Sequence, residues 1–107
     1  MTAEKTGFAV LYRFRIRPEM EAAFTDAWAA LTELIRDHRG GRGSRLHRGD
    51  DGLFYAYAQW PDRAAWEADG SMPPEAELLG RTMAEAIVER LPAIELTPVA
   101  DLLLPEK

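Results

Sequence analysis

The chain has 107 residues, a mass of 12.0 kDa and a formal net charge of −5, values that predict one small globular domain. It has no cysteine and only two histidines, which excludes disulfides, thiolate zinc sites, iron–sulfur clusters and a cysteine nucleophile. It has no apolar run of about 18 residues, the length that spans a membrane, and no apolar stretch of signal-peptide length at its N-terminus. We therefore expect a cytoplasmic protein that does not interact with membranes.

Residues 8–17 are predicted to form the first strand, because their side chains alternate strictly between two faces. One face is apolar and aromatic, and it carries Phe8, Val10, Tyr12, Phe14 and Ile16. The other face carries Ala9, Leu11, Arg13, Arg15 and Arg17. We expect this strand in the centre of a sheet, and the pattern leaves open which of its faces lines the inside of a barrel.

Pro18 is predicted to open a long helix, since proline suits the first helical position, where its missing N–H has no partner to lose. The apolar side chains that follow it have helical spacing and form one stripe: Met20, Phe24, Ala27, Trp28, Leu31, Leu34 and Ile35. Arg36 and Arg39 fall in the last turn, where cations complement the helix dipole. The pair Gly40-Gly41 is predicted to end the helix.

A β-hairpin is predicted next. Residues 43–49 form a short polar strand in which only Leu46 is apolar, so this strand is expected at the edge of the sheet. The turn signal Asp50-Asp51-Gly52 separates it from a strongly apolar strand over residues 53–60.

Two further helices are predicted after the hairpin. Asp62 is expected to cap a short helix over residues 63–68, and a loop follows over residues 69–74. A second long helix is predicted over residues 75–91, because its apolar residues recur at intervals of four: Leu79, Met83, Ile87 and Leu91. Pro92 is expected to end this helix.

A last extended segment is expected over residues 94–104, where Pro98 interrupts any strand pairing. The order β-α-β-β-α-β predicts an α+β, ferredoxin-like fold: an antiparallel sheet with helices on one face. The strand over residues 53–60 nevertheless has apolar or aromatic side chains on both of its faces. Such an uncovered patch usually marks an interface, so we expect a two-fold homodimer in which two sheets close into a dimeric α/β barrel.

Five arginines and both histidines fall within residues 36–48. Nucleic-acid-binding domains are usually strongly basic, whereas this chain is acidic overall and no aromatic residue interleaves with these arginines. The cluster is therefore interpreted as a solvated loop and edge strand, and no nucleic-acid partner is expected.

Three ordered segments carry a resemblance to a known family. The first, Phe14-Arg15-Ile16-Arg17-Pro18-Glu19, leads directly into the first long helix. The second, Gly43-Ser44-Arg45-Leu46-His47-Arg48, precedes an acidic turn. The third and best match is FYAYAQWPDRAAW, residues 54–66, where a strand ends in tryptophan and a capped short helix follows. Over about residues 8–69 the chain resembles the antibiotic biosynthesis monooxygenase family of dimeric α/β-barrel proteins.

The resemblance implies a cofactor-independent monooxygenase that acts on an aromatic polyphenol, quinol or polyketide-like substrate. Some members of that family oxygenate such compounds without metal or flavin, so no cofactor is expected here. Other members degrade haem, a role that calls for a histidine in the second half of the chain, and none follows His47.

The chain departs from the active members in two ways. It contains no asparagine, a residue that several active relatives use in the pocket, and Asp69 stands where a histidine often ends the short helix. A second interpretation therefore stays open: a non-catalytic small-molecule-binding or structural dimer on the same fold. A third is an isomerase, a cyclase or a decomposing enzyme on this scaffold, which hosts several chemistries.

Oxygenation without a cofactor requires a base, a positive or hydrogen-bonding group for an oxyanion, and aromatic walls. We predict Arg13 as the oxyanion clamp and His47 as the base, because the unperturbed pKa of histidine suits neutral pH. Four further residues are predicted to bind the substrate: Arg15, Tyr57, Trp60 and Trp66. The pocket is expected between the sheet and the helices or within the barrel, lined by Tyr57, Trp60 and Trp66, with Arg13 or Arg15 nearby.

Each of these residues also has a purely structural interpretation. The arginines can pair with Glu95 or Asp101 on a neighbouring strand. His47 can be an exposed residue of an arginine-rich hairpin, and the aromatic side chains can belong to a core or a dimer interface.

Overall fold

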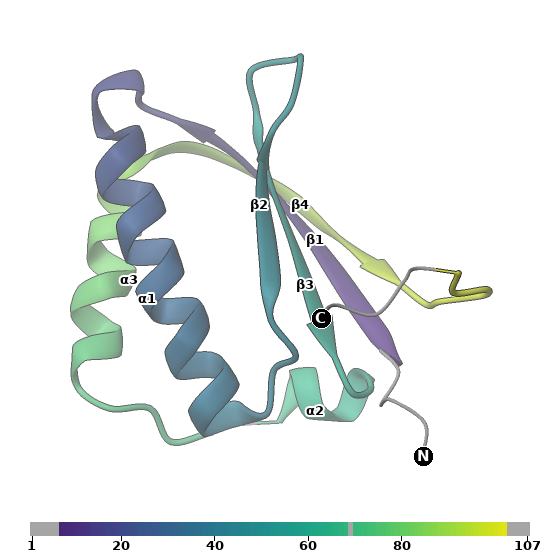
Figure 1. Ribbon diagram of the computed structural model, residues 1–107. Coiled ribbons are helices and arrows are strands. Elements are labelled where there is room, and N and C mark those ends of the chain that lie inside the picture. The colour runs from purple at the N-terminus through teal and green to yellow at the C-terminus, as the bar shows by residue number, and fades with distance from the viewer. Residues whose placement is uncertain (1–6, 69, 103–107) are drawn as a thin grey trace.

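The computed structural model describes residues 7–68 and 70–102. Its elements follow in this order: β1 (Phe8–Ile16), η1 (Pro18–Met20), α1 (Glu21–Arg39), β2 (Ser44–Arg48), β3 (Phe54–Trp60), α2 (Arg63–Glu67), α3 (Glu75–Ala86) and β4 (Ile87–Leu96). The strands pair antiparallel in the order β2-β3-β1-β4, and the long helices α1 and α3 lie together on one side of the sheet (Figure 1). The predicted ferredoxin-like fold is confirmed, as are the central position of β1 and the edge position of β2.

The alternation of β1 decides what lies on each side of the sheet. On the helix side, Tyr12 is paired with Ala56 of β3, whereas Arg13 is paired with Tyr55 on the other side. We call that other side the open face, and its members on β1 are Ala9, Leu11, Arg13 and Arg15. A strand turns successive side chains to opposite sides, so every assignment to the open face or the helix side follows from this register.

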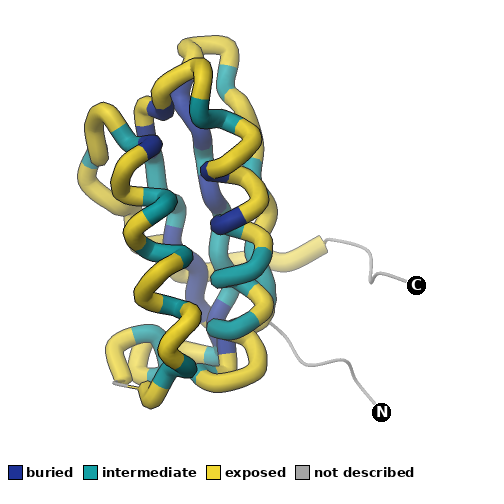
Figure 2. The backbone as a smooth tube through the Cα atoms, turned by 90° about the vertical axis from the view of Figure 1, so that its left-hand side faces the viewer, coloured by how far each residue is buried: buried dark blue, intermediate teal, exposed yellow. Residues whose placement is uncertain are grey.

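The hydrophobic core lies between the sheet and the helices, and Figure 2 shows the buried residues along the strands behind α1 and α3. Phe24 of α1 is fully buried, and its ring lies edge-on to those of Phe14 and Phe54, with centroids 5.6 and 5.9 Å away. A second buried cluster consists of Phe8, Val10 and Trp60, and Tyr12 packs against both clusters.

The second long helix is shorter than predicted. α3 ends at Ala86, and residues 87–91 belong to β4. The Arg17 N–H donates to the Ala86 carbonyl (2.8 Å), and the pairing of β4 with β1 begins at this point. Pairing satisfies backbone polar groups along most of the free edge of β1. This stabilisation outweighs what the apolar side chains would gain from a longer helix.

Pro92 lies inside β4, so the prediction that it ends a helix is wrong. β4 is an edge strand, and its register with β1 shifts here: Leu11 is paired with Ile94, whereas Arg13 is paired with Leu91. Proline is tolerated at such a bulge on an edge strand, because no ladder donor is needed there.

The extended segment predicted over residues 94–104 overlaps β4 only over residues 94–96. The chain then leaves the sheet before Pro98, as expected. Residues 103–104 of this segment, and Asp69 of the predicted loop, lie outside the described residues.

The predicted cap of the short helix and the predicted end of the first long helix are confirmed. The Asp62 side chain accepts a hydrogen bond from the Ala65 N–H (2.7 Å) and caps α2. α1 ends at Gly40, whose φ of 79° lies in the left-handed region that glycine adopts without strain. Its N–H donates to the Ile35 carbonyl.

Arg39, the last residue of α1, joins the end of this helix to α2 and β3. Its Nη2 donates to the carbonyls of Trp66 (2.9 Å) and Ala68 (2.8 Å). Its guanidinium lies 5.2 Å from the centroid of the Trp60 ring. One side chain therefore fixes the place of α2 and the ring of Trp60 together.

We expect Asp62→Ala to lower the free energy of unfolding by about 1 kcal/mol, because it removes the hydrogen bond that satisfies the first turn of α2. Urea unfolding monitored by circular dichroism measures this change. Asp26→Ala is the matched control, since Asp26 is an exposed acid inside α1 and caps no helix. Equal effects of the two substitutions would show that the cap contributes nothing.

Candidate functional site

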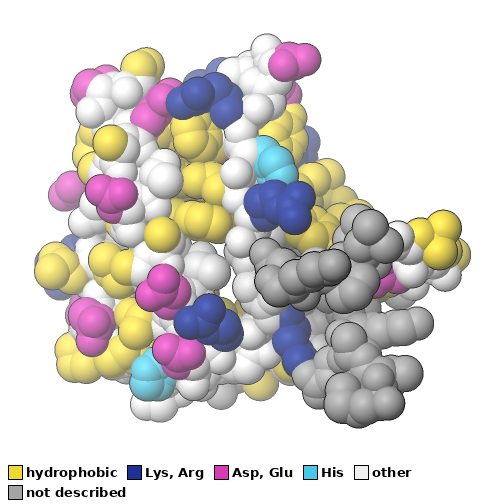
Figure 3. Space-filling view, viewed as in Figure 1, with side chains coloured by type: hydrophobic (Ala, Val, Ile, Leu, Met, Phe, Trp, Pro, Cys, Tyr) yellow, Lys and Arg dark blue, Asp and Glu magenta, His cyan; other side chains and the backbone are white. Residues whose placement is uncertain are grey.

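A cavity of about 230 Å³ lies between α1 and the helix side of the sheet. Figure 3 shows hydrophobic side chains gathered in the hollow between α1 and β2. Four aromatic side chains contribute to its wall: Tyr12, Phe14, Trp28 and Trp60. On β3 the small side chains of Ala56 and Ala58 leave the space open. An apolar cavity with a few polar groups is typical of a small-molecule site.

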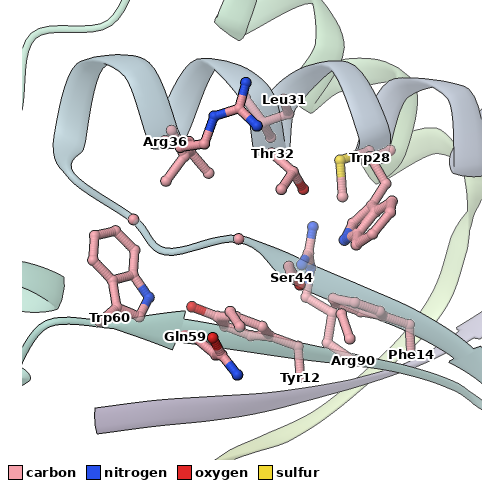
Figure 4. A pocket seen from close by; sticks show the side chains of 16 residues that line it. Tyr12, Phe14, Trp28, Leu31, Thr32, Arg36, Ser44, Gln59, Trp60 and Arg90 are labelled. Carbon is pink, nitrogen blue, oxygen red and sulfur yellow. The ribbon is translucent and has the colours of Figure 1, made fainter. Parts of the chain in front are cut away.

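Trp60 places a hydrogen-bond donor in this wall. The residue is 3% exposed, and its Nε1 has no hydrogen-bond partner in the part of the chain that the structure describes. Figure 4 shows the indole nitrogen on the side of the ring that faces the cavity. A buried N–H without a partner is costly, about 1–3 kcal/mol, so this donor is available to an acceptor oxygen of a ligand.

Tyr12 places a second donor in the wall. Its hydroxyl accepts a hydrogen bond from Trp66 Nε1 (3.0 Å), which leaves its own O–H free to donate toward the cavity. Trp66 itself packs against Phe8, with ring centroids 5.4 Å apart, and is not part of the cavity wall. Trp66 therefore orients the Tyr12 hydroxyl from outside the cavity.

Several polar residues of the wall are not among the predicted site residues, and two of them place donors in the cavity. Ser44 of β2 has a buried hydroxyl without a partner among the described residues, and Arg90 reaches into the cavity from β4. Arg90 falls in the segment predicted as helix, where no alternation is considered. The β-branched pair Ile87-Val88 is a strand signal, but strict alternation from Ile87 would turn Arg90 to the open face. The register shift between Arg15 and Ile16 instead places Arg90 on the helix side, where it is paired with Phe14.

Four of the six predicted site residues lie on the open face, away from this cavity: Arg13, Arg15, His47 and Tyr57. Arg13 Nη2 donates to the Pro92 carbonyl (2.9 Å), and Arg15 forms an ion pair with Glu89 (3.3 Å). Glu95, one of the acids considered as a partner for these arginines, is bound to Arg63.

The expectation that Tyr57, Trp60 and Trp66 line one cavity is wrong. Tyr57 and Trp60 are three residues apart on β3, and the period of two turns them to opposite sides of the sheet. Tyr57 instead lines a groove of about 440 Å³ between the open face and the chain that follows β4. The catalytic roles of Arg13 and His47 stay predictions.

The open face also carries Tyr55, whose hydroxyl is already engaged. It donates to Asp51 in the hairpin turn, and this bond holds the pKa of the Asp51 carboxyl below its ordinary value. The same bond raises the pKa of Tyr55. Tyr55 therefore keeps its proton and holds the turn, and it cannot serve as a base at neutral pH.

The described residues include no group of three or more His, Asp or Glu that could hold a metal ion. Among the helices of residues 7–68 and 70–102, none is long and apolar enough to cross a membrane.

Solved structures share this fold at low sequence identity. A putative antibiotic biosynthesis monooxygenase from Bordetella bronchiseptica has a TM-score of 0.73 and 17% identity, covering 90% of this chain and 100% of that chain. Rv0793 from Mycobacterium tuberculosis has a TM-score of 0.67 and 20% identity, covering 90% and 98%. The monooxygenase ActVA-Orf6 of Streptomyces coelicolor, solved in complex with nanaomycin D, has a TM-score of 0.69 and 22% identity, covering 94% of each chain.

Comparison with curated proteins gives no significant match. The family model for antibiotic biosynthesis monooxygenases matches residues 7–69, more than half of the chain, and this segment runs from β1 through α2. The chain therefore belongs to the antibiotic biosynthesis monooxygenase family.

Proposed function

We propose that this protein is a cofactor-independent monooxygenase that acts on an aromatic polyphenol, quinol or polyketide-like substrate in the cavity under α1. The observation that carries the proposal is the convergence of two donors, Trp60 Nε1–H and the Tyr12 hydroxyl, on a cavity with aromatic walls. Flat rings fit between such walls, and an oxygen on the ring edge would accept from the donors.

The chemistry follows from what the donors stabilise. They favour the anion of a phenol or enol over its neutral form, because hydrogen bonds to a charged oxygen are the stronger ones. For an anthrone-type substrate, the enolate passes one electron to O₂, and the resulting carbon radical and superoxide combine into a peroxide anion. This anion takes up the proton that was lost when the enolate formed and becomes a hydroperoxide. Loss of water from the hydroperoxide leaves a ketone. One O₂ is consumed and one water is released, so no external reductant is required.

The comparisons support an aromatic ligand without identifying it. ActVA-Orf6, a monooxygenase with the same fold, was solved in complex with nanaomycin D. Its identity to this chain is 22%, so the substrate of this protein is inferred from the cavity and not from that complex.

One observation favours the alternative, a small-molecule-binding protein without catalysis. The cavity wall contains no histidine, aspartate or glutamate among the described residues, so no side chain there is a conventional base. Oxygenation in this cavity would start from a substrate that is already ionised or that loses its proton to water. Turnover distinguishes the two functions.

We also propose a homodimer formed through the open face. Ile94 and Leu96 of β4 are 39% and 37% exposed there, and Leu11 and Tyr57 lie beside them on the same face. The arginines of β1 on this face already have partners within the chain, as described above. A second copy would therefore cover apolar surface while Arg13 and Arg15 keep these partners, a backbone carbonyl and a carboxylate.

We expect the purified protein to consume O₂ with at least one member of a panel of dihydroxynaphthalenes and anthrones. Trp60→Phe keeps an aromatic ring but removes the N–H, so it should lower turnover by about 100-fold, the usual effect of losing one donor to a developing oxyanion. An oxygen electrode measures the rates, and circular dichroism verifies that the variant is folded.

Arg13→Ala is the matched comparison, because it tests the site predicted on the open face. If Arg13→Ala abolishes turnover while Trp60→Phe does not, the reaction takes place on the open face and the cavity assignment fails. If the wild type consumes O₂ no faster than buffer with every substrate, the binding function replaces the enzymatic one.

Light scattering after size-exclusion chromatography should give about 24 kDa, twice the 12.0 kDa of one chain. Ile94→Asp places a charge on the open face and should shift the mass toward that of a single chain. Leu78→Asp is the control, since Leu78 is 64% exposed on α3 and lies outside the open face. A wild type that elutes as a single chain at micromolar concentration would rule out the dimer.

A further inference from the structure

The wall of the cavity is positively charged, although the whole chain carries a net charge of −5. It contains two arginines, Arg36 and Arg90, and no lysine, aspartate or glutamate among the described residues. Arg36 forms an ion pair with Asp37 (3.4 Å), which offsets its charge. Arg90 is therefore the cation to consider at this site.

Arg90 is held by stacking and not by an acid. Its guanidinium lies 5.7 Å from the centroid of the Phe14 ring, and no ion pair is formed with a carboxylate in the described part of the chain. Figure 4 shows the side chain extending from β4 past this ring into the cavity. The stacked stem orients the group, and its five N–H donors remain available to a ligand.

Ser44 contributes a neutral donor to the same wall from β2. Its hydroxyl is buried, lines the cavity and lacks a hydrogen-bond partner among the described residues. Buried polar groups are normally satisfied, so an unpaired hydroxyl in the wall points to a polar group on the occupant. The buried Nε1 of Trp60 is the second such group.

We infer that the cavity selects aromatic ligands that carry an anionic oxygen, either the ionised hydroxyl of a hydroxyquinone or a carboxylate on the ring, and that Arg90 binds this oxygen. The inference rests on the proposed function, since it concerns the same cavity, but it requires only binding and not turnover. Charge-assisted hydrogen bonds from a guanidinium strengthen binding of the anion. The negative net charge of the chain disfavours anions elsewhere on its surface, so preference for an anion would have to come from this wall.

Equilibrium binding of two matched probes tests the inference through quenching of tryptophan fluorescence. Lawsone is a hydroxynaphthoquinone that is ionised at neutral pH, and its methyl ether has the same ring system without the charge. Naphthoate and naphthamide form a second pair, which separates a carboxylate from an ionised hydroxyl. We expect the wild type to bind the anion of at least one pair about tenfold more tightly than its neutral partner.

Three variants assign the preference to a residue. Arg90→Met keeps an unbranched stem on the Phe14 ring and removes the charge, so the affinity for the anion should fall about tenfold while that for the neutral partner stays unchanged. Arg90→Lys should retain most of the preference. Arg81→Met, which removes an exposed arginine paired with Glu77 on α3, should change neither affinity.

The outcomes distinguish this inference from the proposed function. If both members of each pair bind equally to the wild type, or if the preference persists in Arg90→Met, the charge selectivity is wrong while the cavity remains a ligand site. If no probe binds, the inference and the proposed function fail together. Loss of both affinities in Arg90→Met alone would mean that Arg90 shapes the cavity and does not select charge.

Discussion

The central strand β1 has to serve two different environments, because the side chains of a strand point alternately to its two sides. On the helix side, Tyr12 and Phe14 form part of the core and of the cavity wall. On the open face, Leu11 lies between Ala9 and Arg13 and is paired with Tyr57 of β3. A slip of one residue in the pairing would exchange the two sets. Core packing, the cavity and the composition of the open face therefore all depend on this one register.

The two donors of the cavity are held by residues outside it. Trp66 donates to the Tyr12 hydroxyl, and Arg39 stacks on Trp60 while it binds the carbonyl of Trp66. Both contacts involve Trp66 of α2, the helix whose first turn is capped by Asp62. Site geometry in proteins is commonly fixed by such outer contacts, so this short helix has a role in positioning although it does not line the cavity.

Most of the fold follows from local patterns in the sequence. The alternation of β1, the glycine that ends α1 and the Asp62 cap each have a direct physical reading, and the structure confirms all three. The boundary between α3 and β4 could not be found in this way. A spacing of four residues continues past Ala86, and only the pairing with β1, which is distant in sequence, makes the segment a strand.

The candidate site was harder to predict than the fold for a related reason. The aromatic residues of β3 do not form one group, because Tyr57 and Trp60 are three residues apart and lie on opposite sides of the sheet. The position of Arg90 in the cavity wall could not be predicted from a helical segment, because it follows from the pairing of Arg90 with Phe14 in the sheet. Ser44 has no local signal, since nothing in a short polar strand indicates which hydroxyl is buried.

The central claim is that a ligand binds in the cavity on the helix side of the sheet and not on the open face. Nuclear magnetic resonance spectra recorded during addition of lawsone test it directly. We predict that the indole signals of Trp60 and Trp28 shift with saturation, while the ring signals of His47 and Tyr57 stay in place. Saturable shifts at His47 and Tyr57, with the Trp60 signal unchanged, would contradict this claim and show that the ligand binds on the open face.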